Sequence, residues 1–310
     1  MVTWARLTFK LQPSSIRFAA FVCLGLAGAA TWLMVNIRSM LAQCETPAAS
    51  HNCGMISVFG SPLGEPVMLL QLGIGLAMYA VPLVLGVPVV SQEIEQRTAM
   101  IAWPLAGSRL RWLVWRAGSV LVIGLVLIGI MAFAAEQLAL APDPDTDLGF
   151  LAHGSRGISL VARSTLMFVV AVAISAAIGR LLPSLLIGIA VAVGLSTAAN
   201  ALPPYGVEPA ELTLSGSDFE GGHALETGHA YRAPDGRPIT NDEAEAMQMA
   251  VFEEYSPELP PNSALPQDVY YGVPGSRYFE VLARESAVMV GASVLVAGVA
   301  AAVVQRRRPE

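Results

Sequence analysis

Six long apolar segments, each of a length that suits a membrane-spanning helix, constrain this chain more than any other feature. They cover residues 18–35, 66–90, 117–135, 158–179, 182–202 and 286–304. The hydrocarbon core of a bilayer is crossed by about 20 apolar residues in helical conformation. Only 14% of the residues are charged, whereas soluble domains carry about 25%. The pattern therefore predicts an all-α integral membrane protein with six transmembrane helices.

The stretch before the first apolar segment has the pattern of an interfacial helix. It places Trp4, Leu7 and Leu11 on one helical face and Arg6 and Lys10 on another, as expected of a helix lying in the membrane surface. No clear small-residue cleavage site follows the first segment, so we interpret that segment as a span rather than as a signal peptide.

The distribution of cations predicts that both termini are cytoplasmic. In that orientation the inner side holds 11 of the 18 Lys and Arg residues and 3 of the 24 acids. Cations close to the ends of spans, such as Arg180 and the cluster at 306–308, favour the cytoplasmic side. We expect a multi-pass protein of the plasma membrane in contact with membrane lipid.

The chain lacks the residues that an ATPase or a metalloenzyme requires. Lys10 is its only lysine, and no glycine-rich loop precedes it, so the chain supplies no P-loop for nucleotide phosphates. No histidine lies in a predicted span and no HExxH motif occurs. We expect no enzymatic activity, no metal and no cofactor bound by this chain, and no nucleic-acid partner.

Two cysteines, Cys44 and Cys53, fall in the first predicted outer loop. Because the outer compartment is oxidising, the sequence predicts a disulfide between them. A metal site that uses His51 with both thiols is the alternative, although three ligands this close do not match a standard zinc spacing.

The interval between the fifth and sixth segments predicts a small extracytoplasmic domain. It is rich in proline and in acidic residues. Residues 241–254 are expected to form a helix capped by Asn241 or Asp242, and the remainder is expected to form loops and turns. The predicted organisation is membrane domain 1–202, outer domain 203–284, and a last span with a basic tail at 285–310.

The longest predicted inner loop, residues 91–112, carries the most informative pattern. Glu93 and Arg97 lie at i and i+4 on a helix, which is a favourable order for an ion pair. Pro104 is expected to end that helix, and Ser108 to cap the next one. Such a loop is either a balanced amphipathic connection or a short helix that transmits force from a soluble partner.

This loop resembles the segment after the second span of ABC-2 type transporter permeases. That segment shows one or two acids, a Thr, an apolar run, a Pro or polar turn, and an Arg with an aromatic residue before the third span. The matching positions here are Glu93, Glu95, Thr98, 100–103, Pro104, Arg109 and Trp112. Arg97 stands where the family often has glycine. The order of six spans and the outer cysteine pair extend the resemblance over nearly the whole chain.

The resemblance implies the membrane subunit of an ATP-driven exporter. Two permease copies, identical or different, would pair, and each would dock an ATP-binding subunit that holds ATP and Mg. The inner loop would be the coupling helix. Its expected coupling residues are Glu93, Glu95, Arg97, Thr98, Trp103, Pro104 and Arg109.

The resemblance also implies a substrate route along the second and fifth spans. The expected residues of this path are Tyr79, Pro82, Glu136 and Arg163. Arg163 and Glu136 are the charged residues nearest to span interiors, and they either snorkel to the outer face or serve the path. The lack of central charges predicts a hydrophobic or amphipathic substrate. The alternative function is a sensor or structural protein whose outer domain binds a ligand without ATP-dependent transport.

The predicted disulfide is tested by thiol labelling. In intact cells Cys44 and Cys53 should resist a membrane-impermeant maleimide until a reductant is added, because both thiols are expected to be oxidised. The Cys53→Ser variant is the control, since it should release Cys44 for labelling without reductant. Ready labelling of the unreduced parent chain would show that the bridge does not form.

Overall fold

The computed structural model of the chain describes residues 12–44, 64–96, 108–141, 150, 152–201, 205–212, 224–254 and 265–306. The chain divides into two compact units. The first comprises Met1–Thr146, Ala152–Ala201 and Leu282–Glu310, and the second comprises Asp147–Leu151 and Leu202–Val281. The main part of the second unit covers residues 202–281, whereas the sequence predicts an outer domain at residues 203–284.

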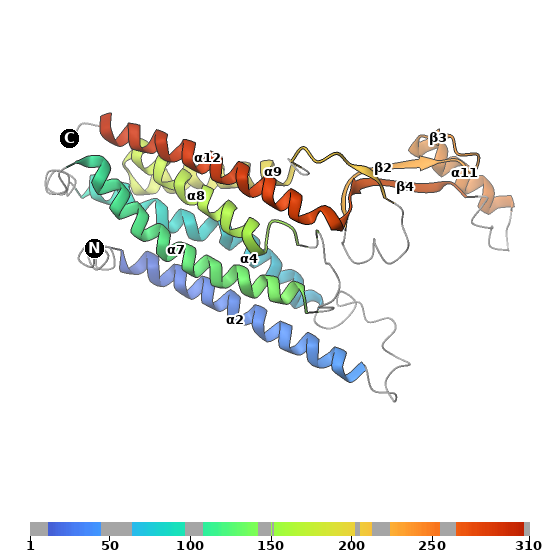
Figure 1. The fold of residues 1–310 in the computed structure, drawn as a ribbon, viewed down its shortest axis with the longest axis horizontal. Helices are drawn as coiled ribbons and strands as arrows, with labels where there is room; N and C mark the ends of the chain where they lie inside the picture. The colour runs from blue at the N-terminus through green and yellow to red at the C-terminus, as the bar shows by residue number, and fades with distance from the viewer. Residues whose placement is uncertain are drawn as a thin grey trace. The chain divides into compact units, whose positions relative to one another are not determined.

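The first unit is a bundle of long apolar helices (Figure 1). In the described part of the chain, six candidate spans are long and apolar enough to cross a membrane, and each overlaps one of the six predicted segments, so the prediction of six apolar membrane-length helices is confirmed. The helices are α2 (Pro13–Cys44), α4 (Gly64–Gly86), α5 (Pro88–Glu95), α7 (Arg109–Ala139), α8 (Gly157–Ile178), α9 (Leu181–Ala201) and α12 (Tyr278–Arg306).

The second span consists of two helices in line, because α4 and α5 are separated only by Val87. The break precedes Pro88, which lacks the backbone N–H that would continue the helical hydrogen bonding. At its other end, the helix that carries Glu93 ends at Glu95, so the expectation that it runs to Pro104 was wrong. Ser108 caps α7 as expected, since its side chain accepts a hydrogen bond from the backbone N–H of Arg111 at 3.1 Å.

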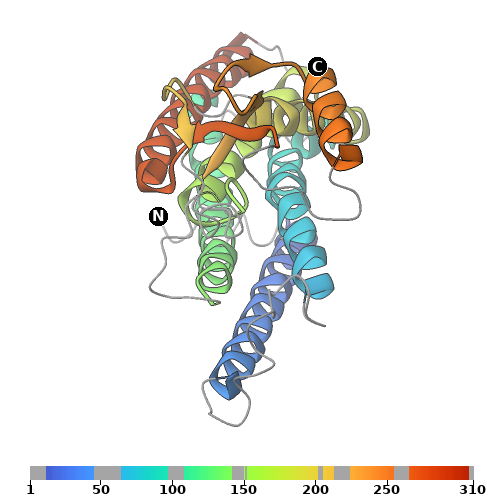
Figure 2. The ribbon, with the colours of Figure 1, turned by 90° about the vertical axis from the view of Figure 1, so that its right-hand side faces the viewer.

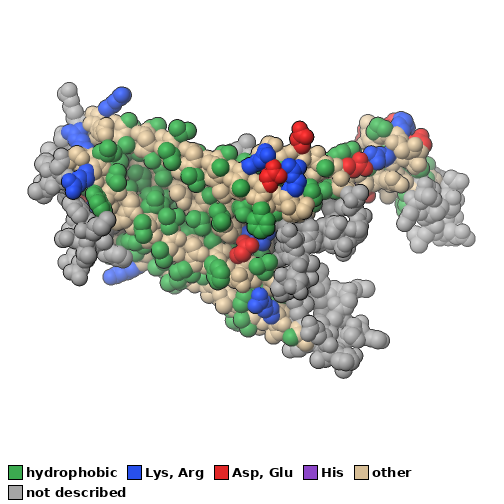
Figure 3. All heavy atoms as spheres, in the orientation of Figure 1, with side chains coloured by type: hydrophobic (Ala, Val, Ile, Leu, Met, Phe, Trp, Pro, Cys, Tyr) green, Lys and Arg blue, Asp and Glu red, His purple; other side chains and the backbone are tan. Residues whose placement is uncertain are grey.

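The α4 helix occupies the centre of the bundle, whereas α9 lies at its periphery. In the most apolar stretch of the span formed by α4 and α5, 72% of the residues are buried, whereas in that of α9 only 11% are buried. Leu182, Leu186 and Val193 of α9 are among its exposed large side chains, and a surface of this kind suits lipid or another apolar partner. Figure 3 shows apolar side chains along the helices, with arginines at the end where α7 begins and α12 ends.

The second unit contains an antiparallel sheet of four strands in the order β1-β4-β2-β3 (Figure 2). The strands are β1 (Ala210–Leu212), β2 (Leu225–Arg232), β3 (Pro238–Ile239) and β4 (Gln267–Val273). This sheet corrects the all-α prediction, which assigned these segments to loops and turns. The protein is mainly helical, but β2 and β4 form a long ladder that was missed because β2 is largely polar and shows no apolar alternation.

A helix packs beside this sheet. The predicted helix at 241–254 is confirmed as α11 (Asn241–Glu254), in contact with β2. Its cap is Thr240 rather than Asn241 or Asp242. The Thr240 N–H donates to the Glu243 carboxylate at 3.0 Å, and the Glu243 N–H donates to Thr240 Oγ1 at 3.3 Å, which is a reciprocal capping box. The bond from the Thr240 N–H lowers the pKa of the Glu243 carboxyl below its usual range.

Several expectations concern parts of the chain outside the described residues. The predicted interfacial helix falls in residues 1–11, and Cys53, His51 and the side chain of Cys44 are also outside the described set. The interfacial helix, the disulfide and the alternative metal site therefore stay predictions.

The close approach of α4 to α8 depends on Gly86. A Cβ atom at this position would lie 2.8 Å from Ala171 Cβ and 2.9 Å from the Phe168 carbonyl oxygen. Gly86→Ala should therefore destabilise the protein by about 1–3 kcal/mol, as overpacked cores do, and lower the melting temperature of the full chain in detergent. Gly129→Ala is the matched control because a Cβ there meets nothing within 4 Å. Equal melting of the two variants would contradict the tight contact.

Candidate functional site

The serines of α8 satisfy the backbone of the second span where its helix is interrupted. Pro82 has no N–H to donate to the Met78 carbonyl, four residues earlier. Ser164 Oγ of α8 donates to that carbonyl oxygen at 3.0 Å. Polar groups freed by proline in a membrane helix need a partner from a neighbouring helix, since lipid supplies none. Pro82 is thus accommodated by α8 and forms no part of the cavity lining described below.

The break at Val87 is held in a similar way. Ser175 Oγ donates to the Val87 carbonyl at 2.7 Å and accepts a hydrogen bond from the Ser91 N–H at 2.9 Å. Ser91 Oγ also donates to the Val87 carbonyl at 2.7 Å. One buried hydroxyl of α8 therefore bridges the end of α4 and the first turn of α5, and fixes the direction in which α5 leaves α4.

A buried ion pair joins α5 to α7. Arg116 Nη1 lies 2.6 Å from Glu93 Oε1, with exposed side-chain fractions of 6% and 7%. Arg116 Nε donates to the Val89 carbonyl at 3.0 Å, and its guanidinium lies 5.9 Å from the centre of the Trp112 ring. A buried pair of this kind is stable only when its remaining polar atoms are also satisfied. The ion pair therefore ties α5 to α7.

The other expected coupling residues are placed differently. Glu95 is exposed, and its Oε2 accepts a hydrogen bond from the Leu181 N–H of α9 at 3.3 Å. Arg109 Nη1 donates to the Gln305 carbonyl of α12 at 3.1 Å. The ends of α5 and α12 and the beginnings of α7 and α9 thus meet at one end of the bundle. The remaining four expected residues, Arg97, Thr98, Trp103 and Pro104, lie outside the described part of the chain.

The predicted partner of Glu93 was Arg97, four residues along the same helix. Glu93 pairs with Arg116, which lies in the next span. The contact between Glu93 and Arg97 stays untested because Arg97 is outside the described residues. Sequence spacing did not point to Arg116, since it lies 23 residues after Glu93 in another helix.

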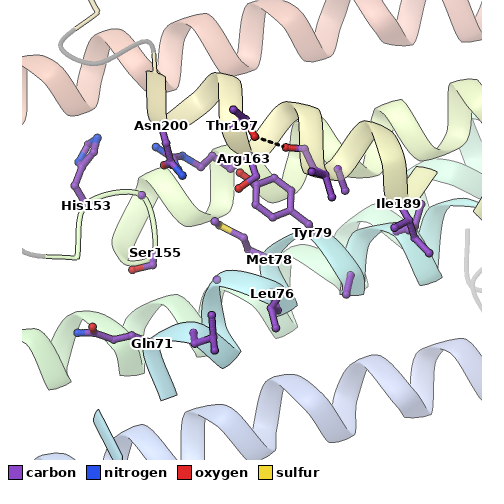
Figure 4. A pocket seen from close by; sticks show the side chains of 18 residues that line it. Gln71, Leu76, Met78, Tyr79, His153, Ser155, Arg163, Ile189, Thr197 and Asn200 are labelled. Carbon is purple, nitrogen blue, oxygen red and sulfur yellow. Dashed lines mark hydrogen bonds between the residues drawn. The ribbon is translucent and has the colours of Figure 1, made fainter. Parts of the chain in front are cut away.

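A cavity of about 560 Å³ opens between α4 and α9, in the part of α4 that precedes the proline-linked break (Figure 4). This volume falls within the usual range of ligand pockets, roughly 300–1,000 Å³. Most of its surface is apolar, with Leu76, Met78 and Leu83 from α4 facing Ile189 and Val193 from α9. Two of the expected path residues, Tyr79 and Arg163, line it, whereas Pro82 and Glu136 do not.

Arg163 belongs to a buried cluster at one end of this cavity. Its Nε donates to Glu285 Oε1 of α12 at 2.6 Å, and its Nη1 donates to Asn200 Oδ1 of α9 at 3.3 Å. Glu285 is fully buried. It also accepts a hydrogen bond from Ser159 Oγ at 2.7 Å and lies 3.1 Å from His153 Nε2. The cluster ties α8, α9 and α12 together with the loop before α8.

The snorkelling interpretation of Arg163 was therefore wrong. Its side chain is only 3% exposed and is directed to a carboxylate inside the bundle. Gly154 makes room for it, because a Cβ there would overlap the guanidinium and because its φ of +83° suits glycine. Glu285 was missed since the sixth span was expected to begin at residue 286, whereas α12 begins at Tyr278. The turn signal at Pro274 and Gly275 marks the true beginning of this helix.

Glu136 lies outside the cavity and pairs elsewhere. Arg156 Nη1, at the start of α8, lies 3.1 Å from Glu136 Oε1 of α7. Glu136 is 31% exposed at its side chain, so this pair is a partly solvated contact between α7 and α8. Among the described residues, no group of three His, Cys, Asp or Glu side chains is placed to hold a metal ion.

Comparison with known proteins places this geometry in a family. The family model described as ABC-2 membrane transporter related matches residues 18–202, which include the first five spans, the cavity and the ion pair between α5 and α7. No curated protein and no solved structure matches the chain.

The buried ion pair generates a direct prediction. Glu93→Gln should cost about 3–5 kcal/mol, because it leaves the Arg116 charge buried without a counter-charge. The exposed Glu95→Gln is the matched control and should melt close to the parent chain. In the double variant Glu93→Gln/Arg116→Gln the loss should be smaller than the sum of the two single losses. Thermal unfolding of the full chain in detergent measures all four, and additive losses would show that the pair contributes nothing.

Proposed function

The chain belongs to the ABC-2 membrane transporter related family, and from this premise we propose that it is the membrane subunit of an ATP-driven exporter. Family and spans together make it a multi-pass membrane component of a transporter rather than the ATPase itself. We propose a location in the plasma membrane with both termini cytoplasmic and with the second unit on the outer side.

One observation carries this proposal: a single interrupted span reaches both the cavity and the end of the bundle where α5 and α12 end and α7 and α9 begin. This charged end of the bundle contains Glu95 and Arg109. α4 lines the cavity with Tyr79 and Leu83, and α5 continues in line to Glu93 and Glu95. Movement imposed on α5 by a soluble partner is thereby delivered to the wall of the cavity. The ion pair of Glu93 with Arg116 spreads the same movement to α7.

The cavity supports a hydrophobic or amphipathic substrate. Its lining is mainly aliphatic, and its polar groups gather toward Arg163 and Asn200. Alternating access then consists of opening this space toward one side of the membrane and afterwards toward the other. The break at Val87, held by Ser175, is the joint at which α4 and α5 change direction relative to each other.

The partners follow from the same premise. Membership of the family implies an ATP-binding subunit, which would hold ATP and Mg and dock at the charged end of the bundle. Glu95 and Arg109, together with the inner loop, are the proposed coupling residues. We also propose a second permease copy, identical or different, and the exposed apolar surface of α9 suits such a partner within the membrane.

The first experiment is affinity purification of the tagged chain in mild detergent, with identification of the proteins that stay bound. We expect a soluble subunit with a P-loop and ATPase activity in the complex. Reconstitution of that complex in proteoliposomes with a lipophilic fluorescent dye should then give dye movement that requires hydrolysable ATP. Recovery of the chain without any ATPase, and dye movement independent of ATP, would favour a sensor or structural protein instead.

Coupling is tested by separating ATP hydrolysis from transport. Glu95→Ala and Arg109→Ala should leave membrane insertion and ATPase activity largely intact but lower dye transport per ATP hydrolysed. The reason is that these variants lose the contacts with α9 and α12 at the charged end of the bundle, where the ATP-binding subunit is proposed to dock. Arg38→Ala is the control, since Arg38 is an exposed arginine in the last turns of α2. Normal transport ratios in both coupling variants would contradict the role given to this end of the bundle.

A further inference from the structure

The cavity between α4 and α9 is polar at one end and apolar at the other. Gln71, His153 and Asn200 lie toward the end that contains Arg163, whereas Ile189 lies toward the opposite end (Figure 4). Leu83 lies near Ile189, because it packs against the adjacent Gly188. In Figure 4 the Tyr79 ring is seen between Arg163 and Asn200 on one side and Ile189 on the other. A cavity with this gradient fits a molecule that has a polar head group and an apolar chain.

Tyr79 adds a polar atom that the protein leaves unused. The residue is only 7% exposed and lines the cavity, and its hydroxyl has no hydrogen-bond partner among the described residues. A buried hydroxyl without a partner costs free energy comparable to a lost hydrogen bond. A ligand atom in the cavity is the natural partner for it, because the Tyr79 side chain lies in the wall of that space.

The polar end offers hydrogen-bond donors and no carboxylate. Asn200 Oδ1 accepts a hydrogen bond from Arg163, so the amide of Asn200 is oriented with its NH₂ group left to donate. Among the described residues that line the cavity there is no Asp or Glu, and Arg163 is the one permanently charged side chain. Glu285, which balances Arg163, is fully buried and is not part of the lining.

We propose that this cavity binds an amphiphile with an anionic, oxygen-rich head group, either a carboxylate or a phosphate, on an apolar chain. The head group accepts hydrogen bonds from Tyr79 Oη and from the amide of Asn200 and lies near the Arg163 guanidinium. The chain extends toward Leu83 and Ile189. This inference rests on the proposed function, since it names the substrate class of the same cavity.

Binding of three single-chain probes to the full chain in phosphatidylcholine nanodiscs tests the inference. The probes are dodecyl phosphate, dodecanoate and dodecyltrimethylammonium, which share one chain length and differ in the head group. One or both anionic probes should bind more tightly than the cation. Tighter binding of dodecyl phosphate identifies a phosphate-bearing lipid as the ligand, and tighter binding of dodecanoate identifies a fatty acid. A cation that binds as tightly as both anions overturns the inference.

Two variants locate the binding. Tyr79→Phe should weaken binding of the anionic probe about threefold to tenfold, which corresponds to one hydrogen bond. The matched control is Thr197→Val, which also removes a hydroxyl from the lining, but one that already donates to the Val193 carbonyl of its own helix. This control should bind like the parent chain. Equal affinity of Tyr79→Phe and the parent chain overturns the inference.

A third variant changes the preferred charge. Asn200→Asp keeps an oxygen that accepts from Arg163 but places a carboxylate in the lining. It should weaken binding of both anionic probes and strengthen binding of dodecyltrimethylammonium, and an unchanged preference overturns the inference. Failure here is distinct from failure of the proposed function. Anionic binding at Tyr79 without ATP-dependent transport would overturn only the function, and ATP-dependent transport with preferred cationic binding would overturn only this inference.

Discussion

The bundle depends on hydrogen bonds that α8 supplies to an interrupted second span. A proline in the middle of a membrane helix leaves a carbonyl without its usual donor, and hydrocarbon offers no water to replace it. Ser164 provides the missing donor to the Met78 carbonyl, and Ser175 adds hydrogen bonds with the Val87 carbonyl and the Ser91 N–H next to Pro88. Because these hydroxyls come from a neighbouring helix, the backbone of the second span is satisfied next to its prolines only while α8 is packed against it. The wall of the cavity that α4 forms and the position of α5 both depend on that packing.

The charged groups inside the bundle are likewise satisfied by partners from neighbouring elements. Among the described residues, two buried pairs of an arginine with a glutamate join separate elements, Glu93 with Arg116 and Glu285 with Arg163. Buried pairs contribute little net stability, but they penalise arrangements in which one partner is lost. The pairs therefore define which helices remain neighbours. One of them lies at the end of the bundle that meets the inner loop, and the other closes one end of the cavity.

The sequence predicted the six spans because apolar length is a local property, and it predicted the cap at Ser108 for the same reason. It did not predict Arg116 as the partner of Glu93 or Glu285 as the partner of Arg163, because these partners come from other helices. The pair of Arg163 with Glu285 joins positions 122 residues apart. The sheet of the second unit was missed because β2, with Glu226, His229 and Arg232, shows no apolar alternation. What escaped prediction was pairing over long distances, and the candidate site consists mainly of such pairings.

One wall of the cavity is formed by α9, which is also the least buried span. Few interior contacts oppose a small displacement of this helix, and Gly188 brings it against Leu83 of α4 without an intervening side chain. Whatever covers α9 in the membrane, lipid or the proposed second copy, therefore lies directly behind that wall. We expect the capacity of the cavity to depend on this outer neighbour of α9 as well as on the residues of its lining.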